Sequence, residues 1–235
     1  MFGLKVTRII MKYRAIIWDC DGVLIDSEVL ACTTAVEVLE GLGHSISLEE
    51  YLRRFMGKSN VQICSEIRLE TGLQLQGDVL SDHLYEEQKK SFIQGLQATP
   101  GVHHVLKNIS VPMAIASGSS PARLQHCLEV TKLAGYFNGH LYSSEMVKRG
   151  KPAPNIFLYA AKKMGIAPKD CLVIEDGIHG LQGAKTAGMD VFAYTGGSHM
   201  NAHLKQNVIN AGANAILSNM NEMLPLLHIS HQNAA

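Results

Sequence analysis

The sequence predicts an α/β fold with a doubly wound parallel-sheet core and an inserted α-helical domain. Short apolar runs that favour β-strands recur along the chain, and helical patterns separate the later ones. Strands that alternate with helices are typical of a parallel sheet with right-handed crossovers. The stretch 27–96, by contrast, contains helical patterns only. A length of 235 residues with 46% hydrophobic and 18% charged residues is enough for a packed core with a smaller inserted domain.

The expected core strands are short runs of apolar, β-favouring residues. They cover residues 15–18, 113–116, 172–174, 191–194 and 215–217. One helix follows Ser120-Pro121, an N-cap and first-turn pair, and another stops at Gly165. Their apolar faces are Leu124, Cys127 and Leu128 in the first helix, and Phe157, Ala160, Ala161 and Met164 in the second.

The inserted stretch begins with a helix that ends near Gly41 and Gly43. Its predicted apolar face is Val29, Cys32, Val36 and Leu39, and further helices are expected near 48–55, 61–70 and 82–94. An ordinary crossover needs only about a dozen residues, so this stretch is expected to be a domain of its own. The predicted division is an N-terminal extension at 1–11, a core at 12–26 and 97–235, and the helical domain at 27–96, with a frayed polar tail at 228–235.

The charge balance and the cysteines exclude several classes of protein. Lys plus Arg equals Asp plus Glu at 21 each, so no net field favours nucleic acid or an anionic membrane. No apolar stretch approaches the ~20 residues of a membrane helix, and residues 1–14 do not have the pattern of a signal peptide. The five cysteines are widely and irregularly spaced, which indicates reduced, buried thiols and a cytoplasmic protein rather than a zinc site or a disulfide framework.

The most informative residues are Asp19, Cys20, Asp21 and Gly22, which follow the first expected strand. Two buried anions on one strand face would repel each other, but at a strand end, with Gly22 turning the backbone, they suit a Mg²⁺ site. One acid can act as a nucleophile towards phosphorus while the other moves protons. Cys20 is expected to point away from both, into the core.

Two weaker motifs follow, and each has a plain alternative. Ser117 closes the second expected strand, where its hydroxyl could donate to a phosphoryl oxygen; ordinary loop chemistry is the alternative. Lys151 lies in a turn stiffened by Pro152 and Pro154, where a fixed ammonium could neutralise a nucleophile and phosphoryl oxygens. A solvated lysine beside a helix start is the alternative there.

Glu175 and Asp176 end another hydrophobic strand and run into Gly177 and Gly180, repeating the layout of the first motif. Carboxylates at neighbouring strand ends can converge on one hard cation, as Mg²⁺ requires. Together with the preceding motifs, these residues resemble the four motifs of the haloacid dehalogenase superfamily. The resemblance implies a Rossmann-like core, and the position of the helical domain implies an α-helical cap, as in β-phosphoglucomutase-like phosphatases. Gly177 departs from the pattern, which more often has Ser there.

The resemblance also implies roles for these residues. Asp19 would attack phosphorus to form an aspartyl-phosphate, and Asp21 would protonate the leaving group and later activate water. Ser117, Gly118 and Lys151 would bind the phosphoryl group. Mg²⁺ would be bound by Asp19, the Asp21 carbonyl and Asp176, with Glu175 as a further contributor. Crowded negative charge is expected to raise the pKa of Asp21.

The expected function is hydrolysis of small sugar or sugar-acid phosphates. The run 19–29 and the cap runs 54–57 and 69–72 are similar to those of bacterial 6-phosphogluconate phosphatases. In the cap loop 53–60, Arg53 and Arg54 could recognise an anionic substrate or form a solvated helix face, and Lys58 is the better candidate. The expected partner is a small phosphorylated metabolite, with no nucleic acid or membrane, and the expected state is a monomer or weak homodimer.

Three rival functions are less consistent with the sequence. β-Phosphoglucomutases carry a cap histidine and a cap arginine where this chain has Ala31 and, approximately, Asn60. Dehalogenases generally lack the second acid, and an inactive binding module would be expected to lose at least one motif. Among the histidines, His199 and His203 are expected at the surface, and His103-His104 in a turn or helix start rather than as a catalytic pair. His179 follows the acids closely, but a role in modulating them is the less favoured alternative.

Overall fold

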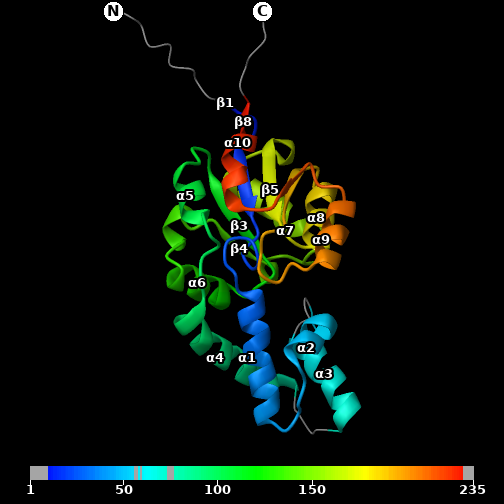
Figure 1. Cartoon of the computed structure of the whole chain (residues 1–235). Coiled ribbons are helices and arrows are strands. Elements are labelled where there is room, and N and C mark those ends of the chain that lie inside the picture. The colour runs from blue at the N-terminus through cyan, green and yellow to red at the C-terminus, as the bar shows by residue number, and fades with distance from the viewer. Residues whose placement is uncertain (1–9, 56–57, 59, 73–76, 230–235) are drawn as a thin grey trace, which may run out of the picture.

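The architecture is a parallel sheet between two helical layers, with a separate group of helices at one end (Figure 1). A computed structural model describes residues 10–55, 58, 60–72 and 77–229. The sheet strands are β2 (Ala15–Trp18), β3 (Met113–Ser117), β4 (Leu141–Ser143), β5 (Cys171–Glu175), β6 (Asp190–Tyr194) and β7 (Ala215–Leu217). They lie in the order β4-β3-β2-β5-β6-β7, and all neighbours are parallel. The predicted doubly wound parallel core is therefore confirmed.

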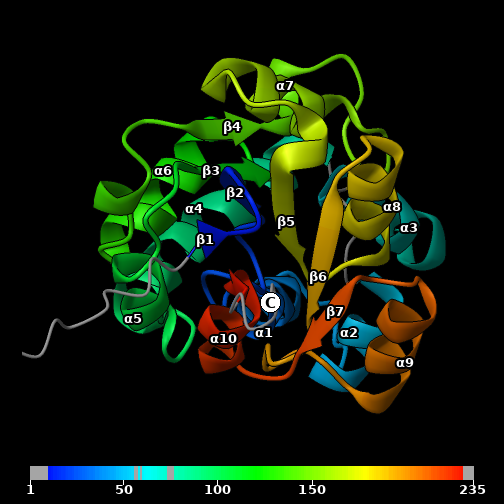
Figure 2. The same cartoon turned by 90° about the horizontal axis from the view of Figure 1, so that it is seen from above.

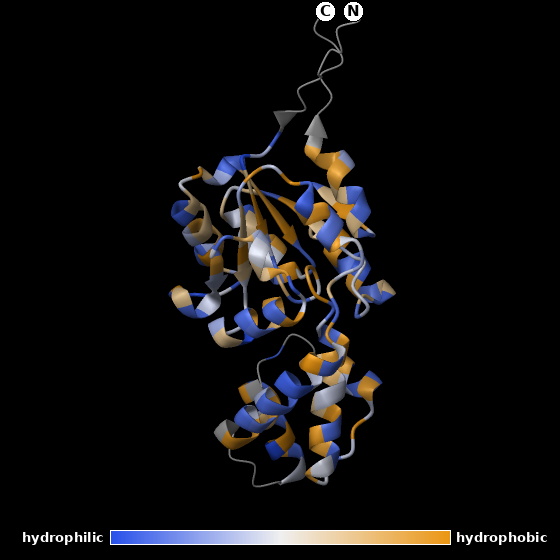
Figure 3. Ribbon diagram, turned by 90° about the vertical axis from the view of Figure 1, so that its left-hand side faces the viewer, coloured by the Kyte–Doolittle hydropathy of each residue, from blue (hydrophilic) through white to orange (hydrophobic). Residues whose placement is uncertain are grey.

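The strands supply two separate cores because successive side chains point to opposite faces of the sheet. In β2, Ile16 and Trp18 belong to one cluster, and Ala15 and Ile17 belong to the other. All four are fully buried, as expected of a parallel sheet covered on both faces. Figure 3 shows the strands as predominantly hydrophobic, whereas the surrounding helices contain both hydrophobic and hydrophilic residues.

Helices cover both faces of the sheet, as the view from above makes clear (Figure 2). The face of Ile16 and Trp18 is covered by α5 (Val102–Lys107), α6 (Pro121–Val130) and α10 (Met223–Leu227). The other face is covered by α7 (Asn155–Met164), α8 (Ile178–Thr186) and α9 (Ala202–Asn210). Short 3-10 turns occur at Ala134–Tyr136, Ser144–Met146, Pro168–Asp170 and Met220–Glu222.

Within the described residues, no helix is both long and apolar enough to cross a membrane.

Two helix boundaries confirm the sequence signals. The Ser120 side chain accepts a hydrogen bond from the Arg123 backbone N–H at 3.3 Å, which caps α6. Gly165 ends α7 in the left-handed region with φ 69°. The five cysteines are buried and unpaired, and Cys20 packs into a sheet core as expected.

The cap consists of four helices inserted between β2 and β3. They are α1 (Glu28–Gly41), α2 (Leu48–Phe55), α3 (Asn60–Thr71) and α4 (Gly77–Gly95). Leu39, Phe55, Ile67 and Leu84 belong to an apolar cluster that is separate from the two sheet cores. Figure 1 places these helices beyond the carboxyl ends of the strands, at the end opposite the antiparallel pair β1 (Ile10–Met11) and β8 (His228–Ile229).

Two linkers run side by side between the core and the cap. The Asp26 N–H donates to the Gln97 carbonyl at 3.1 Å, and the Thr99 N–H donates to the Leu24 carbonyl at 2.9 Å. Ser198, in the loop after β6, donates to Asp26 Oδ1 from both its backbone N–H and its hydroxyl. The loop after β6 is thus tied to the first linker.

Some expectations for the ends and edges were wrong. The tail is not wholly frayed, because His228 and Ile229 pair with Met11 and Ile10; residues 230–235 and 1–9 lie outside the described part.

The edge strand β4 was missed because it has only three residues, pairs with β3 alone and follows no extended apolar run. The α1 face was partly wrong: Ala31, Cys32, Ala35, Val38 and Leu39 are its buried apolar residues, while Val29 and Val36 are partly exposed.

Candidate active site

A cavity of about 700 Å³ lies at the carboxyl ends of β2, β3 and β5, between the sheet and the cap. That size is within the range of small-molecule sites. All the predicted site residues line it: Asp19, Asp21, Lys58, Ser117, Gly118, Lys151, Glu175 and Asp176. The structure therefore brings together residues that are more than 150 positions apart in the sequence.

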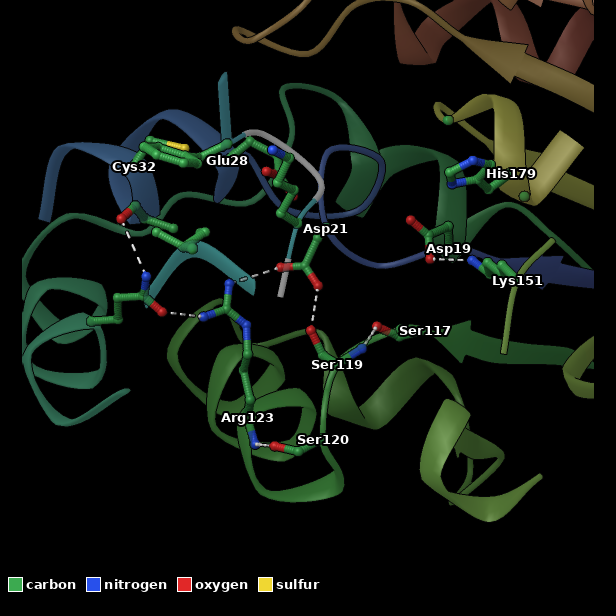
Figure 4. A pocket seen from close by; sticks show the side chains of 18 of the residues that line it. Asp19, Asp21, Glu28, Cys32, Ser117, Ser119, Ser120, Arg123, Lys151 and His179 are labelled. Atoms are coloured by element: carbon green, nitrogen blue, oxygen red, sulfur yellow. Dashed lines mark hydrogen bonds and ion pairs between the residues drawn. The ribbon is translucent and has the colours of Figure 1, made fainter. Parts of the chain in front are cut away.

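Three carboxylates and one ammonium meet at the edge of the sheet. Lys151 Nζ lies 2.7 Å from Asp19 Oδ1 and also contacts Glu175 Oε1. Figure 4 shows Lys151 directed at Asp19. Oxygens of Asp19, Glu175 and Asp176 lie within 4.8 Å of one another. They converge because β2 and β5 are neighbours in the sheet and both end at this edge.

Burial dominates the electrostatics of this cluster. It raises the pKa of Asp19 well above its usual value, the charge of Glu175 raises it further, and Lys151 opposes both. Burial and then Glu175 raise the pKa of Asp176 in the same way. Burial by itself would lower the pKa of Lys151, but Asp19 and Glu175 outweigh it and that pKa rises. The cluster has more acidic than basic groups, so an added cation would stabilise its ionised form.

Glu175 is held from several sides. Its Oε2 accepts hydrogen bonds from the backbone N–H groups of Asp176 at 2.9 Å and Gly177 at 3.0 Å. A Cβ at Gly180 would lie 1.8 Å from Glu175 Oε1, so no side chain fits at that position. A Cβ at Gly177 would meet Glu175 Oε2 only at 3.7 Å, an ordinary contact, so the Cβ of a serine would also fit at this position. Glu175 is therefore fixed against Lys151.

The remaining acids fit a hard divalent cation. Asp19 and Asp176 are buried, lie at adjacent strand ends and offer only carboxylate oxygens as ligands, which suits Mg²⁺. The turn at Gly22 makes their approach possible: its φ is 76°, and a Cβ there would lie 2.0 Å from Asp176 Oδ2. Gly22 thus serves both the turn that the sequence predicted and a close packing that it did not reveal.

Asp21 has a different environment from Asp19. It accepts hydrogen bonds from the hydroxyls of Ser27 at 2.6 Å and Ser119 at 2.7 Å, and from Arg123 at 3.3 Å. Burial favours a raised pKa for Asp21, but Arg123 and the two hydroxyls outweigh it, so the pKa of Asp21 is lowered. The expectation of a raised pKa was wrong because a partly buried guanidinium, unforeseen from the sequence, faces this acid.

The loop after β3 is well supported. Ser117 is buried, and its Oγ accepts a hydrogen bond from the Ser119 N–H at 3.0 Å. The Gly118 carbonyl accepts from the Ser144 hydroxyl at 2.9 Å, and the Ser119 carbonyl accepts from the Ser143 hydroxyl at 2.7 Å. Ser117 and Gly118 therefore lie in a fixed turn beside the carboxylates. Ser119, which donates to Asp21, is a residue that the sequence analysis missed.

Arg123 is the most important residue that the sequence analysis missed. It lies in the first turn of α6, and its guanidinium contacts Asp21 and Gln88 Oε1 on α4, the latter at 2.9 Å (Figure 4). Gln88 in turn donates to the Ala31 carbonyl of α1 at 3.2 Å. The guanidinium also lies 4.7 Å from the centroid of the Phe92 ring. One core cation thus links the second acid to two cap helices, which no local sequence pattern indicates.

The cap side of the cavity carries Lys58 and several hydroxyl groups. Lys58 Nζ lies 2.8 Å from Glu66, so its charge is already paired within the cap. Arg54 pairs with Glu50 and Glu70, and Arg53 is exposed, so both belong to the helix surface. Met56, Gly57 and Ser59 of the predicted recognition loop lie outside the described residues.

The histidine expectations were only partly right. His203 is exposed and His103 lies at the start of α5. His179 is exposed and lines the cavity near the acids. His199 is not a surface residue: its side chain is 6% exposed, and its Nε2 lies 3.1 Å from Asp176 Oδ2. The acid partner was missed because it lies 23 positions away in the sequence, on the neighbouring strand end.

Comparisons with known proteins agree on one family. Residues 13–188 match a family model described as haloacid dehalogenase-like hydrolase. A 6-phosphogluconate phosphatase of Escherichia coli K12 is 31% identical over 189 residues, which cover 80% of this chain and 85% of that protein. A fructose-1-phosphate phosphatase of the same strain is 29% identical over 180 residues, covering 76% of this chain and 95% of that protein.

Solved structures show the same architecture. A haloacid dehalogenase-like protein from Agrobacterium tumefaciens C58 superposes with a TM-score of 0.79 and 34% identity. The match covers 91% of this chain and 97% of that one, so it includes the cap as well as the sheet.

Proposed function

The chain belongs to the haloacid dehalogenase-like hydrolases and is a phosphoric monoester hydrolase, and on that premise we propose that it is a Mg²⁺-dependent phosphatase of small sugar or sugar-acid phosphates. 6-Phosphogluconate is among the proposed substrates. The observation that supports this best is the buried carboxylate of Asp19, 2.7 Å from the Lys151 ammonium and next to two further acids at the sheet edge.

We propose a two-step mechanism on the two acids of the first motif. A carboxylate oxygen of Asp19 bonds to phosphorus as the bond from phosphorus to the sugar oxygen breaks, and the leaving oxygen takes a proton from Asp21. Asp21 then takes a proton from water, whose oxygen attacks phosphorus, and this releases phosphate and restores Asp19. The contact of Asp21 with the cap through Arg123 supports a role on the leaving-group side of the cavity.

The other site residues bind and orient. Ser117, Gly118 and Lys151 are proposed to bind the phosphoryl oxygens, with Lys151 supplying positive charge where negative charge develops. Glu175 holds Lys151 in place rather than serving as a main metal ligand, because its oxygens already have partners. Mg²⁺ would be bound by Asp19, Asp176 and the Asp21 carbonyl, and would supply charge stabilisation of the phosphoryl group.

The cavity lining supports a polyhydroxylated substrate. On the leaving-group side it combines Arg123 and Lys58 with Glu28 and with the hydroxyl groups of Ser81 and Tyr85. Groups of both signs and hydroxyls, beside the apolar faces of Tyr51 and Phe55, offer the many hydrogen bonds that a sugar or sugar acid can form. The names of the similar phosphatases point to the same substrate class.

A phosphosugar mutase is the alternative, and one observation disfavours it. Ala31 lines the cavity at the place where mutases of this family carry a histidine, so the imidazole is absent there. Lys58, a cation of the cap that lines the cavity, is paired with Glu66.

We propose that 12–26 and 97–235 form the phosphatase core, that 27–96 form the cap and that 1–11 take no part in catalysis. A cytoplasmic location is proposed because all five thiols are free. The proposed state is a monomer or weak homodimer.

A substrate screen tests the proposal. Purified protein with Mg²⁺ would be assayed against sugar phosphates, sugar-acid phosphates, nucleotides and p-nitrophenyl phosphate, with Asp19→Asn as the inactive control. We expect the highest kcat/KM for sugar or sugar-acid phosphates. A preference for nucleotides would overturn the substrate class, and inactivity towards every ester would overturn the phosphatase assignment for this site.

A further inference from the structure

We propose that His199 is a positioning residue that holds the Asp176 carboxylate in the orientation required for cation binding. The inference rests on the proposed metal role of Asp176. His199 lies in the loop between β6 and α9, outside all four motifs.

The contact between the two side chains is close and buried. His199 Nε2 lies 3.1 Å from Asp176 Oδ2, and the exposed fractions of the two side chains are 6% and 11%. A Cβ at Gly22 would lie 2.0 Å from Asp176 Oδ2 and 2.8 Å from His199 Cε1. The Gly22 backbone and the imidazole thus enclose one oxygen of Asp176, which restricts rotation of the carboxylate.

The loop holds His199 in this place from both sides. Its neighbour Ser198 donates to Asp26 Oδ1 at 3.1 Å from the backbone and at 2.7 Å from the hydroxyl. Its other neighbour, Met200, is buried in a sheet core, and the Met200 N–H donates to the Gly197 carbonyl at 3.0 Å. The imidazole is therefore fixed by its backbone as well as by its contacts.

The second ring nitrogen argues against a purely packing role. Among the described residues, His199 Nδ1 is buried and has no hydrogen-bond partner. An unpartnered polar atom in the interior is unfavourable, and an apolar side chain of similar size would fill the space without that cost. The imidazole is explained by its other nitrogen, which contacts the acid. Groups that orient a metal ligand typically change metal affinity about 10–100-fold when removed.

Metal binding without substrate tests the inference. Chelator-treated full-length protein would be titrated with Mn²⁺, and free Mn²⁺ would be followed by electron paramagnetic resonance. His199→Leu keeps bulk but removes the nitrogen, and His199→Gln keeps an amide N–H near the position of Nε2. His203→Ala is the matched control, because His203 is exposed four residues later and its Nε2 lies 3.0 Å from Asn207 Nδ2 on the same helix. Circular dichroism would verify folding, and His199→Asn, whose amide is too short to reach Asp176, would replace His199→Leu if that variant does not fold.

We expect His199→Leu, or His199→Asn in its place, to weaken Mn²⁺ binding about tenfold or more, and His199→Gln and His203→Ala to stay within about threefold of the wild type. Wild-type affinity in the variant without the nitrogen would overturn the inference. Equal weakening by His199→Gln would also overturn it, because packing rather than the nitrogen would then be responsible. If the wild-type chain itself binds no Mn²⁺, the proposed metal role of Asp176 fails first.

Discussion

The cavity has two walls of different construction, and each contains one acid of the first motif. The sheet-edge wall (Asp19, Lys151, Glu175 and Asp176) is built entirely from the core. The cap-facing wall (Asp21, Ser119, Arg123 and Gln88) joins the core to α4. Under the proposed mechanism, phosphoryl chemistry would take place on the sheet-edge wall, while the acid proposed to serve the leaving group is coupled to the cap through Arg123 and Gln88.

The charges of the two walls differ as well. At the sheet edge one lysine faces Asp19 and Glu175, with Asp176 close by, and burial raises the pKa of Asp19. At the cap-facing wall Arg123 and two hydroxyls face Asp21 and lower its pKa. Two carboxylates only two positions apart therefore have pKa values shifted in opposite directions. These directions are the reverse of those that the proposed roles require, so the proposed mechanism needs a bound cation to keep Asp19 ionised and the negative charge of the substrate to raise the pKa of Asp21.

The largest effect is expected at the sheet-edge wall, from Asp19→Asn. The substitution keeps the size of the side chain but removes the nucleophilic charge, so kcat should fall by about 10⁴-fold or more while the protein stays folded. Steady-state kinetics and circular dichroism would measure both. Near-normal activity in the folded variant would show that the nucleophile lies elsewhere.

The next effect concerns the cation. Chelation with EDTA should abolish activity, Mg²⁺ should restore it, and Asp176→Ala should raise the Mg²⁺ concentration for half-maximal activity about tenfold or more. The titration is read from initial rates. Full activity in chelator, or restoration by Zn²⁺ alone, would contradict a hard, oxygen-bound cation.

A smaller effect is expected where the two walls meet. Arg123→Gln removes the charge beside Asp21 and weakens the link to Gln88, so kcat should fall by about 100-fold through misplacement of Asp21, and amide exchange in α4 should increase. His126→Ala is the control, because His126 contacts the Lys89 carbonyl across the same α4–α6 contact without touching Asp21. Equal loss of kcat in both variants would mean that cap docking alone matters.

The smallest effect is expected on the cap. Lys58→Ala should raise KM for an acidic sugar phosphate about 2–5-fold, as expected for one partly exposed charge, and leave KM for p-nitrophenyl phosphate almost unchanged. Arg53→Ala, which removes an exposed charge on α2, is the control. An equal rise for both substrates would exclude Lys58 from leaving-group recognition.

The sequence predicted the sheet-edge wall better than the cap-facing wall, for a physical reason. Asp19, Ser117 and Asp176 each follow a short apolar run, and strand ends of a parallel sheet meet at one edge, so local patterns were sufficient. Lys151 lay in a turn marked by two prolines.

The missed residues have no such local mark. Arg123 and His199 depend on contacts between elements distant in the sequence, and a charged residue in a helix or a histidine in a loop is ordinarily at the surface. The helices of the cap were predicted from periodicity, whereas the α1 face was only partly right, because the buried face is centred on Ala31, Ala35 and Val38 and is rotated away from Val29 and Val36.

The most direct test of the account is the site of covalent phosphorylation. Enzyme turning over a good substrate would be quenched in acid, the acyl phosphate reduced with borohydride, and the modified position located by mass spectrometry. The account predicts that the carboxyl of Asp19 is reduced to an alcohol in the wild type and that no position is modified in Asp19→Asn. Modification at another residue, or none during rapid turnover, would contradict the proposal that Asp19 accepts the phosphoryl group.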